Sequence, residues 1–93
     1  MITVEKLRTY QEFDGDIDGW ARASKGKGDR SMSDTDWYLI NELLTGLTII
    51  ETGLASSSFV RDVEDKMRAS TTDEATCAAL RTLVKRQRQN DVA

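Results

Sequence analysis

The stretch SDTDWYLINELLTGLTIIETG at residues 33–53 decides the fold of this 93-residue chain. Ser33 can cap a helix, and Asp36, three residues later, completes a capping box in which aspartate replaces the usual glutamate. Acidic side chains in the first turn also suit the positive end of the helix dipole. The stretch therefore predicts a long helix over about residues 34–53, with Gly53 as its C-terminal cap.

The apolar residues of this predicted helix cover a wide arc. At 100° per residue they span roughly 160° of the helical wheel, whereas an ordinary surface helix shows about 100°. We therefore expect this helix at the centre of the domain, in contact with neighbours on two sides. Gly46 costs its interior about 1 kcal/mol relative to alanine, but a glycine there allows another helix to approach closely. The arc consists of Trp37, Leu39, Ile40, Leu43, Leu44, Leu47, Ile50 and Leu54.

Four further helical segments are expected, two before the central helix and two after it. Thr3 can cap the first, and the serines at 56–58 can cap the fourth of the five. The sequence TTDE at 71–74 has the form of a capping box for the fifth. The segments cover about residues 3–12, 14–24, 58–67 and 71–89. Each has a narrow apolar stripe, formed in chain order by Val4, Leu7 and Tyr10; Ile17, Trp20 and Ala21; Phe59, Val60, Val63 and Met67; and Thr76, Cys77, Leu80, Leu83 and Val84.

These segments predict one all-α domain over residues 1–93. We expect a compact bundle of four to five short helices around the central helix at about 34–53. No segment shows the alternation of polar and apolar residues that is typical of a strand. A charged run with two glycines predicts a flexible loop near 25–33, and the tail at 89–93 is expected to fray.

The composition excludes several classes of function. The chain has no histidine and a single cysteine, Cys77, so it cannot form a Ser–His or Cys–His nucleophile. On the apolar stripe of its helix, Cys77 is expected to be a buried, inert thiol. The net charge is −3, whereas most nucleic-acid binders are basic. We therefore expect a non-catalytic protein without a cofactor.

The sequence also favours a cytoplasmic location. Its first residues carry charges where a signal peptide needs an apolar run. The longest uncharged apolar stretch, residues 43–50, is far shorter than a membrane span. A single cysteine fits a reducing compartment. No membrane partner is expected.

The acidic run at 14–19 resembles the first half of an EF-hand calcium loop. Asp14, Asp16 and Asp18 take the first three ligand positions, and a glycine follows. The second half departs from the pattern, since Lys25 stands where a bidentate glutamate is required and Arg22 stands at the ninth position. We interpret the run as a turn between helices in which Asp14 or Asp16 caps the second helix, and not as a functional metal site. Weak divalent-cation binding is the alternative.

The last predicted helix carries a basic face formed by Arg81, Lys85 and Arg88, with Arg86 nearby. Positive charges near a helix C-terminus complement the dipole and need no ligand. The alternative is a patch for an acidic partner or for nucleic-acid phosphates. No aromatic residue is interleaved, so nucleic-acid bases would find no stacking platform on this face.

Two apolar side chains of the central helix, Tyr38 and Ile49, fall outside its apolar arc. They are the leading candidates for contact with a protein partner, with Glu42 and Thr45 as a polar rim. A partner helix could approach closely at Gly46, which lies between this pair and the arc. The rival interpretation is that the first helix packs over the pair inside the monomer.

The favoured function is that of a small cytosolic protein-binding, adaptor or regulatory module. Its partner is another protein or a second copy of the chain. A nucleic-acid-associated regulator that uses the basic face of the last helix is the less favoured alternative. An enzyme is least favoured, because it would depend on carboxylates or lysines predicted to face solvent.

Overall fold

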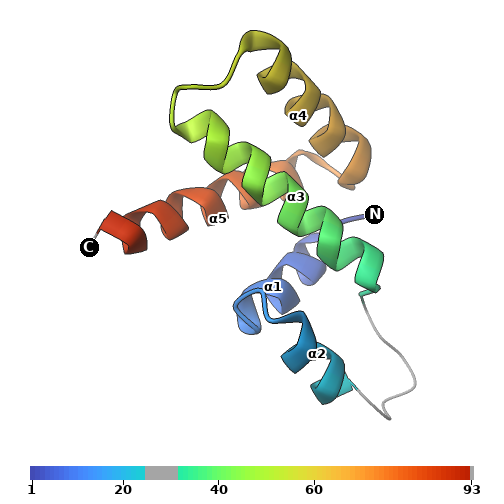
Figure 1. The fold of residues 1–93 in the computed structure, drawn as a ribbon. Coiled ribbons are helices and arrows are strands. Elements are labelled where there is room, and N and C mark those ends of the chain that lie inside the picture. Colours follow the sequence, from blue (N-terminus) through green and yellow to red (C-terminus); the bar gives the residue numbers. More distant parts are fainter. Residues whose placement is uncertain (25–31, 93) are drawn as a thin grey trace.

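The computed structural model describes residues 1–24 and 32–92, except for the side chains at 88 and 90–92. The described parts form α-helices without a strand, and the predicted all-α bundle is confirmed (Figure 1). The flexible loop predicted near 25–33 lies, but for its last two residues, outside the described residues. The helices are α1 (Val4–Glu12), α2 (Ile17–Ser24), α3 (Asp34–Glu51), α4 (Ser57–Ser70) and α5 (Glu74–Val92).

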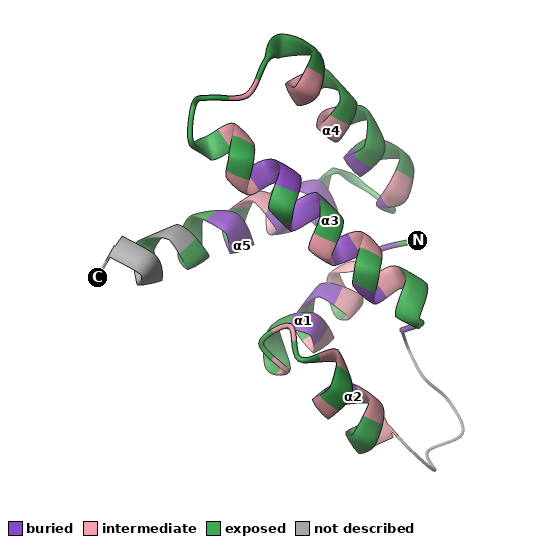
Figure 2. Ribbon diagram, in the orientation of Figure 1, coloured by how far each residue is buried: buried purple, intermediate pink, exposed green. Residues whose placement is uncertain are grey.

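The central position predicted for α3 is confirmed. α3 runs diagonally through the molecule and contacts α1, α4 and α5 (Figure 1). Its buried positions run from Trp37 to Leu47 (Figure 2), and the contacts with three helices show that neighbours cover it on more than one side. The buried residues of α3 are Trp37, Ile40, Leu43, Leu44, Gly46 and Leu47.

Side-chain caps fix where three of the helices begin. The hydroxyl of Thr3 accepts a hydrogen bond from the Lys6 backbone N–H at the start of α1. Ser33 and Asp36 form the predicted capping box of α3, each side chain accepting from the backbone N–H of the other residue. Ser56 is the cap that α4 uses, out of the three serines that the sequence offered. These bonds satisfy N–H groups that otherwise have no partner within a helix.

The cap predicted for α5 was misplaced. The helix begins at Glu74, and Asp73 caps it by accepting hydrogen bonds from the Thr76 backbone N–H and the Thr76 hydroxyl. Thr71, the expected cap, instead donates its hydroxyl to the Met67 carbonyl at 2.8 Å and so closes α4. The carboxylate of Asp73 reaches its own first turn better than a threonine two residues earlier can.

The prediction that Leu54 belongs to the buried arc of α3 was wrong. The helix ends at Glu51, and Gly53 follows with a φ of +78°, a conformation that favours glycine. The chain therefore changes direction before Leu54, and the helical period no longer applies to it. Leu54 is 88% exposed in the connection to α4.

An aromatic cluster joins α1 and α2 to the start of α3. The Trp37 ring lies between those of Tyr10 and Trp20, with a centroid separation of 5.1 Å in each case. The Tyr10 hydroxyl donates to the Asn41 side chain, so the first and third helices are also tied by a polar contact. Trp37 is fully buried, and its indole N–H has no hydrogen-bond partner among the described residues.

The segment before α1 is anchored by its backbone. Ile2 is fully buried, donates its N–H to the Ser70 carbonyl at 2.8 Å and accepts from the Thr72 N–H at 3.2 Å. It thus runs beside the connection between α4 and α5. Sequence periodicity gave no sign of this anchor, because Ile2 lies outside any helical stripe.

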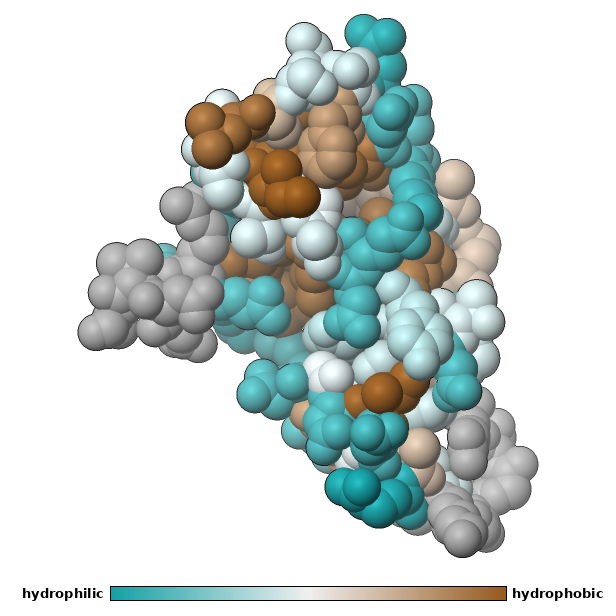
Figure 3. Space-filling model, viewed as in Figure 1, coloured by the Kyte–Doolittle hydropathy of each residue, from teal (hydrophilic) through white to brown (hydrophobic). Residues whose placement is uncertain are grey.

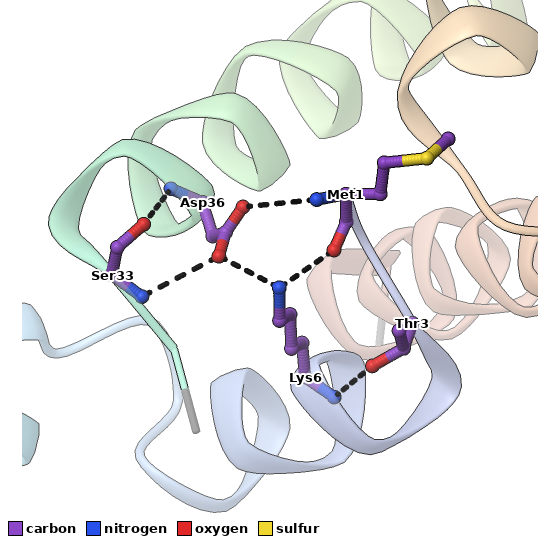
Figure 4. A network of polar contacts seen from close by, with 5 residues as sticks. All are labelled: Met1, Thr3, Lys6, Ser33 and Asp36. Atoms are coloured by element: carbon purple, nitrogen blue, oxygen red, sulfur yellow. Dashed lines mark hydrogen bonds and ion pairs between the residues drawn. The ribbon is translucent and has the colours of Figure 1, made fainter. Parts of the chain in front are cut away.

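A polar network at the same end links α1 to α3 (Figure 4). The Lys6 ammonium lies 2.9 Å from Asp36 Oδ2 and donates to the Met1 carbonyl at 2.7 Å. Burial raises the pKa of the Asp36 carboxyl, but hydrogen bonds from Lys6 and from the Ser33 N–H, with the positive charge of Lys6, outweigh it. The pKa of Asp36 therefore lies below its ordinary value.

The molecule is flat, with principal extents of 44 × 33 × 19 Å. Its thickness is about two helix diameters. The end of α5 extends beyond the other helices and stays helical to Val92 (Figure 1). Fraying of the tail at 89–93 concerns motion and stays a prediction. None of the described helices combines the length and the apolar character needed to cross a lipid bilayer.

Candidate functional site

The described residues form an open groove of about 490 Å³ between α3 and α4. Figure 3 shows hydrophobic side chains gathered over the end of α3 and the start of α4. The middle of the groove is apolar, and polar side chains line the end that lies away from the loop between α3 and α4. The lining residues are Asn41, Glu42, Leu43, Thr45, Gly46, Ile49, Phe59, Val63 and Lys66.

Gly46 allows α3 and α4 to pack closely at the bottom of the groove. A Cβ atom at this position would lie 2.9 Å from a methyl group of Val63 on α4, closer than real Cβ contacts allow. The prediction that Gly46 lets another helix approach closely is therefore confirmed. That helix is α4 of the same chain, and the expectation that a partner helix approaches at Gly46 stays a prediction.

The structure separates the two predicted contact residues. Tyr38 and Ile49 are both exposed, so α1 does not cover them in the monomer. Eleven residues of helix place them about 16 Å apart along the axis. Ile49 lines the groove and Tyr38 does not. The exposed side chains of Glu42 and Thr45 lie between them on the same face, in the positions expected for a polar rim.

Ile49 belongs to a ridge between two hollows. On the side away from α4, Asn41, Thr45 and Ile49 also line a second hollow of about 290 Å³. Its other walls come from Tyr10, Leu44, Thr48 and Gln87. The face of α3 that contains Ile49 is thus raised between two depressions.

Leu54 and Phe59 were not predicted as site residues. Leu54 lies in the loop that connects α3 and α4, the two helices that form the groove. Phe59 lines the groove from the first turn of α4. A signal for Leu54 was present in the sequence, because a residue beyond the Gly53 cap cannot share the wheel of the preceding helix. Phe59 was assigned to the core stripe of α4. It is only half-buried, and it lines the groove.

An ion pair marks the polar end of the groove. The ammonium of Lys66 on α4 contacts the carboxylate of Glu42 on α3, and both side chains are well exposed. An exposed pair of this kind adds little to stability. It does place one positive and one negative charge side by side at the edge of an apolar surface.

The residues of the basic face predicted on α5 have different surroundings in the structure. Arg81 lies 2.8 Å from Glu64 on α4, so its charge is balanced inside the fold. Lys85 is exposed, and the side chain of Arg88 lies outside the described residues. Arg86 lines a shallow groove of about 210 Å³ between α1 and α5 together with Arg8. The predicted face of Arg81, Lys85 and Arg88 therefore stays a prediction.

The acidic run forms the capped turn that was predicted. Asp16 Oδ1 accepts the Gly19 backbone N–H at 3.1 Å at the start of α2. A Cβ atom at Gly19 would lie too close to the Asp16 carboxylate, so that carboxylate would have to move to admit a side chain there. Asp14 adopts a positive φ of 52° in the turn before it. Within the described residues, which include Asp14, Asp16 and Asp18, no three acidic or cysteine side chains gather where they could hold a metal ion.

Cys77 is buried, as expected. Its sulfur lies 3.1 Å from the Thr71 hydroxyl oxygen, between the end of α4 and the start of α5. Burial keeps this thiol away from dissolved reactants, in the manner of a small apolar core residue.

Comparison of the chain with protein-family models, with curated proteins and with solved structures gave no match. The geometry of its surface is therefore the basis for the functional argument.

Proposed function

We propose that this chain is a non-catalytic protein-binding module whose contact surface is the groove between α3 and α4. The observation that carries the proposal is an apolar hollow of about 490 Å³ with an 88% exposed leucine, Leu54, in the loop that joins its two helices. The free energy falls when a partner removes an exposed leucine and an apolar hollow from water, so both features favour binding.

The surroundings of the groove have the usual anatomy of an interface. Ile49 and Phe59 supply an apolar centre, Leu54 is exposed in the loop that joins the two helices, and the polar pair of Glu42 and Lys66 supplies a rim. Fully buried interface centres are depleted in charged residues, whereas rims are polar. Tyr38 stands apart from this arrangement.

Two further observations fit a binding role in the cytosol. The chain has no histidine, and the described carboxylates form no cluster that could hold a metal ion. Its one cysteine is a buried free thiol, which fits a reducing compartment.

Site-specific photocrosslinking in the source cell tests the proposal. A photoreactive p-benzoylphenylalanine replaces Leu54 in one variant and Tyr38 in a matched control, since both side chains are exposed. We expect irradiation to join position 54 to a defined protein, identified by mass spectrometry, and to give far less product from position 38.

The captured protein is then purified and titrated with the wild-type chain and with Ile49→Asp. Binding should weaken by about tenfold or more in the variant, because a charge enters the apolar centre. Absence of a crosslink at position 54, or equal crosslinking at both positions, would rule out the groove as the contact surface.

A further inference from the structure

We propose that the groove between α1 and α5 binds an acidic segment of a partner protein, whose carboxylates pair with Arg8 and Arg86. This surface shares no lining residue with the groove between α3 and α4. The inference therefore goes beyond the proposed function, and either proposal can fail without the other. It gives the chain a second contact surface, at which charge selects the partner.

The groove has an apolar floor and a polar rim, and each of its two helices supplies part of both. Leu7 on α1 and Leu83 on α5 are buried beneath it, beside the half-buried Val4 and Ala79. Residues three or four apart are neighbours on a helix surface, so the exposed lining residues form one short row on each helix. They are Arg8 and Gln11 on α1, and Thr82 and Arg86 on α5.

Both charged residues that line the groove are cations. Arg8 and Arg86 are exposed, and neither forms an ion pair with another described residue. By contrast, Lys6, Lys66 and Arg81 each contact a carboxylate of the same chain. A guanidinium binds a carboxylate through two parallel hydrogen bonds. Two guanidiniums over one groove therefore favour an occupant that carries carboxylates.

The size of the groove fits one side chain better than a whole small molecule. Its volume is about 210 Å³, whereas sites that enclose a drug-sized ligand have about 300–1,000 Å³. An apolar side chain placed over Leu7 and Leu83 would leave water, which favours binding. We therefore expect an acidic segment in which carboxylates flank an apolar residue.

A neighbouring hollow argues against nucleic-acid phosphates as the occupant. It has a volume of about 160 Å³, shares Gln11, Leu83 and Arg86 with the groove, and is also lined by the exposed Asp14. A single strand follows a continuous positive groove and stacks its bases on aromatic side chains. Here a row of phosphates would meet a carboxylate beyond Arg86, and none of the described residues that line the groove itself is aromatic.

Titration of the isotope-labelled chain with a capped peptide, acetyl-Glu-Glu-Leu-Glu-Glu-amide, tests the proposal by NMR. We expect a saturable shift of the backbone amides of α1 and α5 that line the groove, at millimolar peptide or below. A peptide with glutamine in place of every glutamate should bind about tenfold more weakly, because it has no carboxylates to pair with the arginines. A peptide with serine in place of the leucine should bind about fivefold more weakly, because the apolar contact is lost.

Variants of the two arginines locate the binding site. Arg8→Gln and Arg86→Gln should each raise the dissociation constant about threefold, as expected for one exposed ion pair. Together they should raise it about tenfold. Arg61→Gln is the matched control and should leave the constant unchanged, because Arg61 is an exposed arginine on α4 outside the groove.

A charge reversal separates a direct contact from a change in the fold. In a double variant that combines Arg8→Glu with Arg86→Glu, the acidic peptide should no longer bind. The basic peptide acetyl-Lys-Lys-Leu-Lys-Lys-amide should bind this variant instead, and should not bind the wild type. Damage to the fold cannot produce this exchange, and circular dichroism verifies that the variant is helical.

Three outcomes would overturn the proposal. The acidic peptide shifts none of the amides that line the groove, or Arg61→Gln weakens binding as much as Arg86→Gln does. The third is that oligothymidylate binds at Arg8 and Arg86 more tightly than the peptide, which would assign the groove to nucleic acid. The proposed function is unaffected by each of them, because crosslinks from position 54 test the groove between α3 and α4 separately.

Discussion

Leu43 and Leu54 show how far the surroundings of one residue type differ within this small molecule. Leu43 is 1% exposed in the middle of α3, where α4 and α5 close over the helix. Leu54 is 88% exposed in the loop that follows. Burial of a leucine contributes about 1.5–3 kcal/mol relative to leaving it in water, so only Leu43 can stabilise the monomer in this way.

The two leucines give a matched test of this difference. Leu43→Ala should lower the free energy of unfolding by about 2–5 kcal/mol, because it removes buried methyl groups and leaves a cavity. Leu54→Ala should change it by no more than about 0.5 kcal/mol in the monomer. Urea unfolding at a concentration where the chain is monomeric measures both. Equal losses would show that Leu54 is part of the core after all.

For single residues, the sequence predicted most buried positions within helices but missed those outside them. The stripe of α5, from Thr76 to Val84, is buried as its period indicated. Ile2 and Met32 are as deeply buried, yet each lies outside the helices, shortly before α1 and α3 begin. Their burial depends on which helices lie next to them, and periodicity along one helix holds no information about that.

Among the elements, the crossing of α3 and α4 depends on a missing side chain. Gly46 faces Val63, whose branched side chain has few alternative rotamers in a helix. An added methyl group must therefore push α4 away. The groove above this crossing exists in its present form because the two backbones approach so closely below it.

A double-mutant cycle measures this constraint. Alanine normally stabilises a helix interior by about 1 kcal/mol relative to glycine. We expect Gly46→Ala to destabilise the chain by about 1 kcal/mol or more, because the overpacking penalty is larger than that gain. In a Val63→Ala background the same change should stabilise it, since the methyl group that it meets is gone. The crossing would not be as tight as described if Gly46→Ala raised the unfolding free energy equally in both backgrounds.

The sequence predicted the helices better than their ends and contacts. The capping box of α3 and the serine cap of α4 were readable because side chain and N–H lie three residues apart in the chain. The groove was not readable, because it arises from two helices packed at a glycine and from a loop that leaves Leu54 in solvent. Of the two predicted contact residues, Tyr38 and Ile49, only Ile49 lines the groove.

For the whole molecule, stability against acid should depend on the contact between α1 and α3. The pKa of Asp36 is lower in the folded chain than in the unfolded chain, where it is about 3.9. Such a group stabilises the fold above the unfolded pKa, and its contribution is lost as the pH falls through the folded pKa. Protonation therefore weakens the link that Lys6 makes to the central helix.

Asp36→Asn should remove this pH dependence. We expect the variant to be less stable than the wild type at pH 7, and to lose less of its stability between pH 7 and pH 3. Urea unfolding at both pH values checks this, with Asp65→Asn, which changes an exposed carboxylate on α4, as the control. A variant that loses as much stability on acidification as the wild type would assign the acid sensitivity to other carboxyls.

The aromatic cluster has a consequence for spectroscopy. Both tryptophans of the chain, Trp20 and Trp37, stack on each other where α2 meets the start of α3. Intrinsic fluorescence therefore reports on that corner alone, whereas far-ultraviolet circular dichroism averages over all the helices. Because α2 is a short helix with a single buried residue, Trp20, it can detach while the rest stays folded. Different midpoints from the two signals would then record the departure of one helix, and neither signal alone would measure the stability of the whole protein.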